Sequence, residues 1–417
     1  FERTPGGEEV NQNSTIPDPI MGGPADFKIT LEGVAPGPTS LIGFYADQHF
    51  RADSSRFSNE GVVRFKKDEG YPQGMYYLTL PNNQFVQILL GEDQKFEMSA
   101  QAGNYNRTMV VKGCEENEML YQTMQFEMKF NPQYKHITTS LEKLQEGTPD
   151  YNIMVEQKKL KEKERQDYLD NLYTNHNDLL FTQFKKAGQN PVVREGLPDN
   201  EKVYHFRNEF WDNVNFGDRR LIRTPVIINK LKRYMKEITP QNPDSVFASA
   251  KRLVDSSLTY PEYYKFFANW ITLQYEPTKC TLMDPEAVFV NMARNYFTRE
   301  RAFWSDSMEV YAIQNRAMEM GQSLVGQQGP NVTSKDPDGN TVSLFDLKAD
   351  YLIVYMYNPQ CEHCMEQTPK LVQWYKEWKN KGADVFGIAL DTNHEEWTDY
   401  IKKNGMNWTN VYDPTNR

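Results

Sequence analysis

The chain has 417 residues, a length that corresponds to about three domains of ordinary size. Hydrophobic residues make up 39% and charged residues 25%, which is ordinary for a globular protein and excludes collagen-like, disordered and disulfide-scaffold classes. The net charge is −10 and there is no basic block, so nucleic acid and anionic membrane surfaces are poor candidates for partners. No apolar run approaches the roughly 18 residues that a transmembrane helix needs.

The first segment, residues 1–26, is polar and rich in proline, glycine and asparagine. It lacks the basic start and the apolar core of a signal peptide. We therefore expect a disordered tether at the start of a mature chain, whose targeting segment is missing or was removed.

Residues 27–113 form the second segment, in which apolar and polar residues alternate with a period of two, as in FKITL at 27–31. Glycine, proline and asparagine separate these runs, which recur at intervals of about ten residues. The pattern predicts a β-domain, either an antiparallel β-sandwich or an open barrel. The expected strands are 27–31, 41–45, 62–65, 74–80, 85–90, 95–98 and 109–111.

Residues 114–321 form the third segment, where apolar residues recur with a period of 3.6. Prolines divide the segment and the connections are short, so we expect an all-α domain, either a bundle or a solenoid-like stack. The charged run from Lys158 to Arg165 is interpreted as the solvated face of a helix. The expected helices are one that contains Met119 to Phe126, and then 151–186, 199–214, 224–237, 243–257, 261–276, 284–298 and 303–320.

Residues 322–417 show a different pattern. A turn at Pro337 to Asn340 precedes the apolar run Tyr351–Tyr357, which is typical of a buried parallel strand. A helix to about Asn380, a buried strand at 385–390 and a helix at 394–403 complete a β-α-β unit. The pair Cys361 and Cys364, spaced C-x-x-C, falls at the turn from the first strand into the helix.

A cysteine pair at the start of a helix has a clear chemical use. The first sulfur lies at the positive end of the helix dipole, which stabilises its thiolate, and the second lies one turn later. Cys361 is thus the expected nucleophile, and Cys364 is the expected resolving thiol that releases a mixed disulfide. Two alternatives stay open: a zinc site, which needs two further ligands, and a purely structural disulfide. Cys114 and Cys280 are isolated and are expected to be free thiols.

The last segment resembles the thioredoxin-like envelope oxidoreductases of the TlpA and ResA type. Asp338 to Leu347 resembles the hairpin of that family, Pro369 falls on its helix-kinking proline, and Asp391 matches the turn after its second strand. The resemblance implies a thioredoxin-like domain that exchanges disulfides with protein substrates or an envelope redox partner. It also implies a periplasmic or cell-envelope location in a Gram-negative bacterium, with a lipid anchor as one option.

The upstream segments resemble two domain families of unknown function that precede such thioredoxin domains. The β-domain over 27–113 resembles one of them, and the helical segment carries the signature of the other at 210–213 and 223–225. A complete thioredoxin fold also needs a further helix, a strand with a cis-proline, an edge strand and a final helix after Asp413. We therefore expect residues beyond Arg417 that this sequence does not contain.

Three positions depart from the family pattern. Gln360 replaces a tryptophan before the first cysteine, Gln367 replaces a glutamate, and Tyr355 stands where thioredoxins carry a buried aspartate. The residues left to modulate the thiols are Glu362, His363 and Glu366, together with Gln360 itself. His363 would stabilise a thiolate and Glu362 would oppose it, so the direction of catalysis stays open.

Two functions fit these observations. The first is thiol-disulfide exchange through Cys361 and Cys364, with the upstream domains as adaptors for substrates or partners. The second is a non-catalytic binding or assembly subunit of an envelope or outer-membrane complex, in which the thioredoxin-like domain is a scaffold. No phosphate loop, nucleotide fingerprint or serine triad is present, so we expect no cofactor. We also expect no metal, because Cys114 and Cys280 are isolated from the pair and no further ligands stand at suitable spacing.

Overall fold

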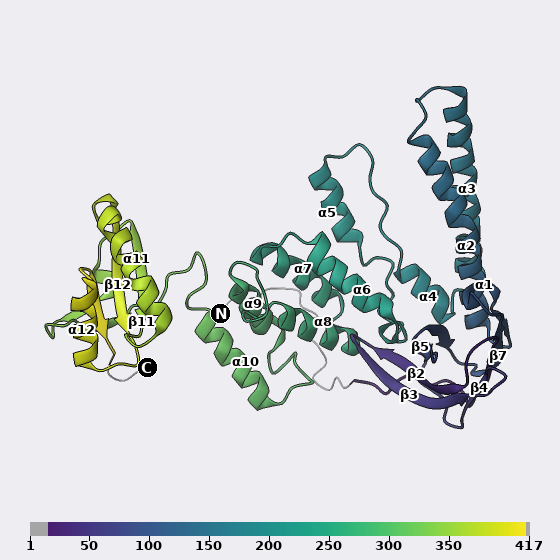
Figure 1. The fold of residues 1–417 in the computed structure, drawn as a ribbon, viewed down its shortest axis with the longest axis horizontal. Helices are drawn as coiled ribbons and strands as arrows, with labels where there is room; N and C mark the ends of the chain where they lie inside the picture. The colour runs from purple at the N-terminus through teal and green to yellow at the C-terminus, as the bar shows by residue number, and fades with distance from the viewer. Residues whose placement is uncertain (1–15, 414–417) are drawn as a thin grey trace. The chain divides into compact units, whose positions relative to one another are not determined.

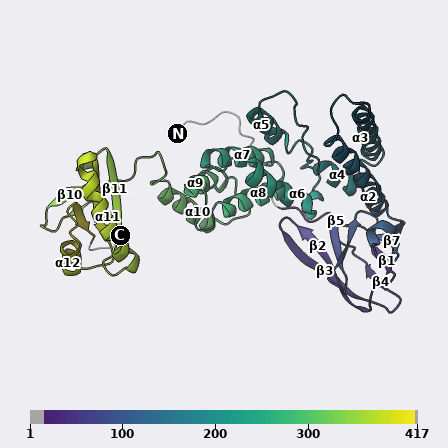
Figure 2. The same ribbon diagram turned by 45° about the horizontal axis from the view of Figure 1, so that its top comes forward.

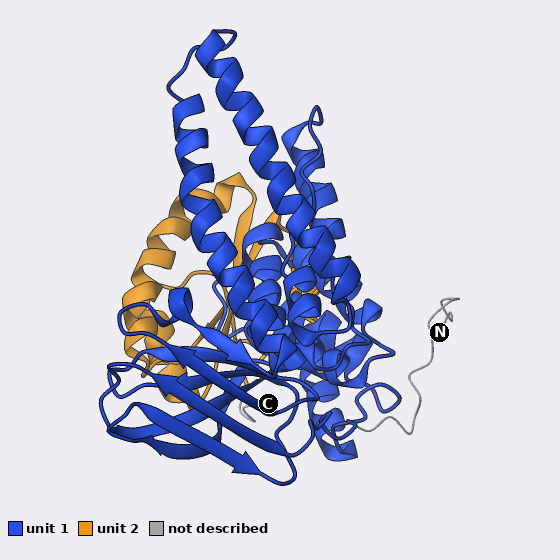
Figure 3. Ribbon diagram, turned by 90° about the vertical axis from the view of Figure 1, so that its right-hand side faces the viewer, with its two compact units in different colours: residues 1–321 blue, residues 322–417 orange. Residues whose placement is uncertain are grey.

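The computed structural model describes residues 16–413, which divide into two compact units. The first unit ends at Gly321 and the second begins at Gln322 (Figure 3). Residues 1–15, which the sequence places in the tether, lie outside the described residues. Residues 17–23 are part of the fold, because Gly22 and Gly23 donate backbone hydrogen bonds to Tyr71 and Glu92. Arg219 holds the same stretch through the carbonyls of Pro17 and Asp18.

The first unit begins with two four-stranded sheets (Figure 2), ordered β4-β1-β7-β8 and β3-β2-β5-β6. The alternation seen in the sequence places Phe27, Ile29 and Leu31 of β1 in the core, all fully buried. The strands are β1 Ala25–Leu31, β2 Gly37–Tyr45, β3 Gln48–Phe57, β4 Val62–Lys67, β5 Gly74–Thr79, β6 Phe85–Leu90, β7 Lys95–Ala100 and β8 Val110–Lys112.

One strand of these sheets, β3, has no counterpart among the expected strands. It lies at the edge of its sheet, where most of its side chains are exposed or half-buried. A strand that buries so little has no need of alternating apolar residues, so the period-two pattern is absent from its sequence.

Helices make up the rest of the first unit (Figure 1). The segment expected as one helix over 151–186 is in fact two, because α3 ends at Asn175 and α4 begins at Leu180. Thr148 caps α3 through a hydrogen bond from the Tyr151 backbone N–H. The helices are α1 Tyr105–Thr108, α2 Glu115–Leu141, α3 Pro149–Asn175, α4 Leu180–Ala187, α5 Asp199–Glu209, α6 Pro225–Arg233, α7 Pro243–Ser256, α8 Pro261–Gln274, α9 Pro285–Tyr296 and α10 Ser307–Met320.

The sheets and helices of the first unit share one hydrophobic core. On α2, the fully buried Asn117 side chain bonds both the N–H and the C=O of Leu89 in edge strand β6, at 2.8 and 2.7 Å. One turn later the Tyr121 hydroxyl donates to the Gln87 carbonyl at 2.8 Å. Helix α2 therefore occupies the outer edge of β6, where a further strand would otherwise pair.

The second unit is a five-stranded sheet with two long helices. Its strand order is β10-β9-β13-β12-β11, and β11, β12 and β13 run parallel. Separate hydrophobic clusters lie on the two faces of the sheet, one under α11 and α12 and one around Phe386. The elements are β9 Thr333–Lys335, β10 Thr341–Ser343, β11 Tyr351–Tyr357, α11 Glu362–Trp378, β12 Ala383–Ala389, α12 His394–Asn404 and β13 Thr409–Tyr412.

The expected hairpin turn forms between β9 and β10. Asp336 accepts backbone hydrogen bonds from Asp338 and Asn340, and Gly339 takes a positive φ of 85° that favours glycine. Among residues 16–413, no helix combines the length and the apolar character needed to cross a bilayer. The predicted order of domains is confirmed: N-terminal sheets, a central helical region and a C-terminal α/β domain. The N-terminal sheets are not purely antiparallel, because β1 and β7 pair in parallel.

Candidate functional site

The two cysteines of the C-x-x-C pair lie at the start of α11, directly after β11. Cys361 is the N-cap residue, and Cys364 lies in the first turn. The connection is held by Asn358, which accepts a hydrogen bond from the Gln360 backbone N–H at 2.7 Å and one from the Cys361 N–H at 3.1 Å. The backbone N–H groups of a first helical turn have no partner within the helix, so they face the N-cap side chain.

The two thiols have opposite pKa shifts. The pKa of Cys361 is lowered, chiefly by a hydrogen bond from the Cys364 backbone N–H, then by one with the Cys364 thiol and one from the His363 N–H. Partial burial and the charge of Glu362 oppose this effect. The pKa of Cys364 is raised, first by burial, which the backbone N–H of Asn358 partly offsets. The two shifts thus favour the thiolate form at Cys361 and the protonated form at Cys364.

Both cysteines are half-buried, and Cys364 packs against the hydrophobic cluster under α11 and α12. Of the four residues expected to modulate the pair, Glu362, His363 and Glu366 are exposed on α11. Gln360 instead reaches α12, where its amide donates to Glu396 at 3.2 Å.

A cluster of hydroxyl groups beside Cys364 was not anticipated from the sequence. Tyr355 of β11, Thr368 of α11 and Tyr400 of α12 join through contacts of 2.8 Å. The hydroxyls of Thr368 and Tyr400 also lie within hydrogen-bond distance of the Cys364 carbonyl oxygen, at 2.8 and 3.2 Å. Two signals were available in the sequence: Thr368 lies four residues after Cys364, on the same helix face, and Tyr355 replaces the buried aspartate of thioredoxins.

The isolated cysteines lie in the first unit, and both are free. Cys114 is the buried N-cap residue of α2, where burial raises its pKa and the Asn117 amide donates to its sulfur at 3.2 Å. Cys280 is half-buried and accepts from the Leu282 N–H at 3.3 Å. Within residues 16–413, no group of three or more histidine, cysteine, aspartate or glutamate side chains is placed to hold a metal ion.

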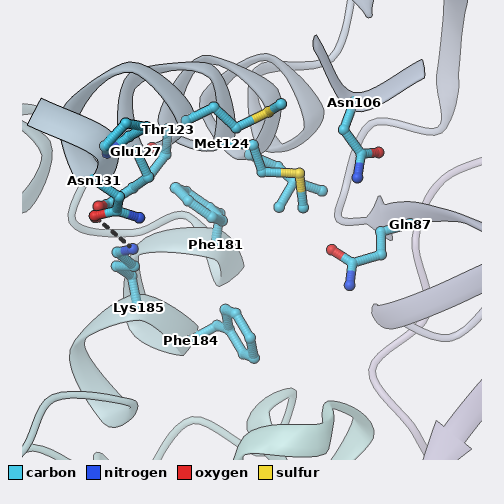
Figure 4. Close-up of a pocket in the computed structure, with 12 residues that line it drawn as sticks. Gln87, Asn106, Thr123, Met124, Glu127, Asn131, Phe181, Phe184 and Lys185 are labelled. Atoms are coloured by element: carbon cyan, nitrogen blue, oxygen red, sulfur yellow. Dashed lines mark hydrogen bonds and ion pairs between the residues drawn. The ribbon is translucent and has the colours of Figure 1, made fainter. Parts of the chain in front are cut away.

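A pocket of about 500 Å³ lies in the first unit among β6, α2 and α4 (Figure 4). Leu120 and Phe181 are among the buried apolar residues that line it. The carboxylate of Glu127 lies at the pocket, 3.4 Å from Lys185 Nζ and 3.3 Å from Arg165 Nη2. The pocket contains no cysteine, so it is not part of the dithiol site.

Comparison with known proteins places the second unit in a class. The AhpC/TSA family model matches residues 325–417. Thiol-disulfide oxidoreductase ResA of Bacillus subtilis is 25% identical over 104 residues, which are 25% of this chain and 58% of that protein. Residues 325–417 are therefore a thioredoxin-like domain of the TlpA/ResA type.

Two further similar proteins are a peroxiredoxin and a thioredoxin-like protein of known structure. Peroxiredoxin Q of Oryza sativa subsp. japonica is 32% identical over 100 residues, which are 23% of this chain and 45% of that protein. The crystal structure of a thioredoxin-like protein from Bacteroides caccae aligns with 54% of this chain and 82% of its own, with a TM-score of 0.42 and 19% identity. The chain thus spans about half the length of the curated relatives it matches.

Proposed function

We propose that this protein exchanges disulfides with protein substrates through Cys361 and Cys364. The Cys361 thiolate attacks a substrate disulfide and forms a mixed disulfide, while the first substrate sulfur leaves as a thiolate. The Cys364 thiol then loses its proton to solvent and attacks Cys361 Sγ, which releases the second substrate sulfur. The protein dithiol is oxidised, and the substrate disulfide is reduced by the same two electrons.

One observation carries this proposal: the opposite pKa shifts of two thiols one helical turn apart. A structural disulfide has no need of a stabilised thiolate, and a zinc site needs additional ligands. Membership of the last domain in the TlpA/ResA class supports the same chemistry.

Reduction of insulin by dithiothreitol tests the proposal. The wild-type chain is expected to accelerate insulin precipitation, and Cys361→Ser is expected to abolish the acceleration. Cys364→Ser is expected to accumulate a mixed disulfide with insulin, visible by mass spectrometry. Equal rates for the wild type and Cys361→Ser would contradict the proposal. Hydrogen peroxide as the oxidant tests the alternative chemistry that the name peroxiredoxin Q suggests.

The second candidate function is a binding or assembly subunit in which the dithiol is vestigial. The observation that favours it is the first unit, which holds a lined pocket but no cysteine pair. The departures at Gln360, Gln367 and Tyr355 point the same way. An inactive wild type in the insulin and peroxide assays would favour this candidate over the first.

We also propose a location in the periplasm or cell envelope, with a lipid anchor as one means of attachment. The support is the resemblance to envelope oxidoreductases alone. Fractionation of producing cells, followed by protease treatment of intact spheroplasts, tests it. Protection from the protease would contradict an outward-facing location.

A further inference from the structure

The hydroxyl cluster of Tyr355, Thr368 and Tyr400 joins the three elements that surround the dithiol, β11, α11 and α12. Thr368 is fully buried, Tyr400 is nearly so, and Tyr355 is half-buried. Tyr355 and Cys364 pack against the same hydrophobic cluster. The ring of Tyr357 stacks on the rings of Tyr355 and Tyr400, with distances between ring centroids of 5.2 and 5.6 Å.

Each hydroxyl has a single proton to donate, and this limits the pattern of hydrogen bonds. Two arrangements satisfy all three groups. In both, Tyr355 donates to Thr368; Thr368 then donates either directly to the Cys364 carbonyl or to Tyr400, which donates to that carbonyl. A chain of this kind polarises each member in the same direction and is more rigid than its separate bonds. The carbonyl at its end belongs to the residue that carries the resolving thiol.

The cluster keeps its protons while the thiols titrate. Burial raises the pKa of Tyr355 and of Tyr400, and the charge of either cysteine thiolate raises it further, although the contact with Thr368 opposes this. Among the charged or titratable residues of the surrounding helices, Glu362, His363 and Glu366 of α11 and Glu396 of α12 are exposed. The hydroxyl cluster therefore holds Cys364 without placing a carboxylate beside its sulfur.

We propose that Tyr355 is a positioning residue for the second step of disulfide exchange, acting through Thr368 and Tyr400 to fix the Cys364 carbonyl and hence the approach of Cys364 Sγ to Cys361 Sγ. The inference rests on the proposed function. In the step concerned, the Cys361–Cys364 bond forms as the bond from Cys361 to the substrate sulfur breaks. Attack of Cys361 on the substrate precedes this step and does not use the cluster.

Stopped-flow reaction of the reduced, full-length chain with 5,5′-dithiobis(2-nitrobenzoate) separates the two steps. Attack by Cys361 releases one thionitrobenzoate at a rate proportional to the reagent concentration. Attack by Cys364 releases the second at a rate independent of that concentration. The Cys361→Ser variant supplies the signal from the other cysteines.

Tyr355→Phe is expected to slow the second phase by about tenfold, the effect of one lost hydrogen bond, and to leave the first phase unchanged. The pH midpoint of the second phase should stay that of the wild type, because the group that must lose a proton in this phase is the Cys364 thiol and not the Tyr355 hydroxyl. Tyr375→Phe is the matched control: the Tyr375 hydroxyl, on α11, donates to Asp384 instead of the cluster, and neither phase should change.

A second pair of variants tests the same point if Tyr355→Phe is unstable. Thr368→Val keeps the side-chain shape but removes the central hydroxyl, and it should slow the second phase as Tyr355→Phe does. Thr368→Ser restores the hydroxyl and should restore the rate. Unchanged second phases in Tyr355→Phe and Thr368→Val would overturn the inference. A wild type without two phases would instead overturn the proposed function.

Discussion

Several buried tyrosine hydroxyls of the first unit link packed elements, whereas two tyrosine hydroxyls of the second unit lie beside the dithiol. In the first unit, Tyr121, Tyr263 and Tyr275 donate to main-chain carbonyls of other elements, at 2.8, 2.7 and 3.0 Å. In the second unit, Tyr355 and Tyr400 bond to Thr368, beside the reactive thiol. Tyrosine hydroxyls thus link packed elements in the first unit and lie beside the dithiol in the second. Polar substitutions in the first unit should change stability alone, whereas those around Cys364 should change reactivity.

The largest expected effect is that of Asn117→Ala. Loss of this side chain leaves the N–H and C=O of Leu89 unpaired in the core, where each unsatisfied group costs about 1–3 kcal/mol. The free energy of unfolding of the first unit should fall by about 4 kcal/mol, measured by urea denaturation. Asn131→Ala, an exposed position on the same helix, is the control and should change it by less than about 0.5 kcal/mol. Similar stabilities for the two variants would contradict the role of Asn117 in pairing the Leu89 backbone groups.

The next largest effect concerns pH and Lys230. This lysine is buried over the Phe210 ring, its Nζ bonds the Gln189 carbonyl at 3.2 Å, and burial lowers its pKa to about 8. The unfolded chain, with the ordinary lysine pKa, then binds more protons between pH 8 and about 10.5, so stability should rise with pH in that window. The expected rise is about 2–3 kcal/mol. Lys230→Met should lack it, and equal slopes for wild type and variant would disprove the claim.

A smaller effect is expected for Tyr263→Phe, the direct counterpart of Tyr355→Phe. The Tyr263 hydroxyl donates to the Asp218 carbonyl in the core, so its loss should cost about 1–2 kcal/mol of stability. Both phases of the thionitrobenzoate reaction should keep their wild-type rates. A slower second phase in Tyr263→Phe would remove the distinction between the two units.

The smallest effect is expected for Glu362→Gln. The Glu362 charge opposes the thiolate of Cys361, so its removal should lower the Cys361 pKa further. Because Glu362 is exposed and screened by solvent, the alkylation rate at pH 7 should rise by less than about fivefold. A slower alkylation would show that Glu362 acts on the thiol in another way.

The sequence predicts what depends on local pattern. The β-α-β order and the place of Cys361 at the head of a helix follow from short-range periodicity and spacing. The hydroxyl cluster could not be predicted from such local patterns, because its members Tyr355, Thr368 and Tyr400 meet only when a strand and two helices pack together. The polar edge strand β3 was missed because burial, not conformation, produces the alternation that is read as a strand. The catalytic roles of Cys361 and Cys364 stay predictions.

The contact between α2 and edge strand β6 has a consequence for how this protein could be dissected or recombined. A fragment that ends before Asn117 would leave the outer backbone groups of Gln87 and Leu89 unpaired. A strand of another molecule could then pair with this edge, which favours aggregation. During synthesis, the sheets would remain in this state until the first turns of α2 emerged from the ribosome. The sheets and α2 therefore form one folding unit, even though their sequences show two different periodicities.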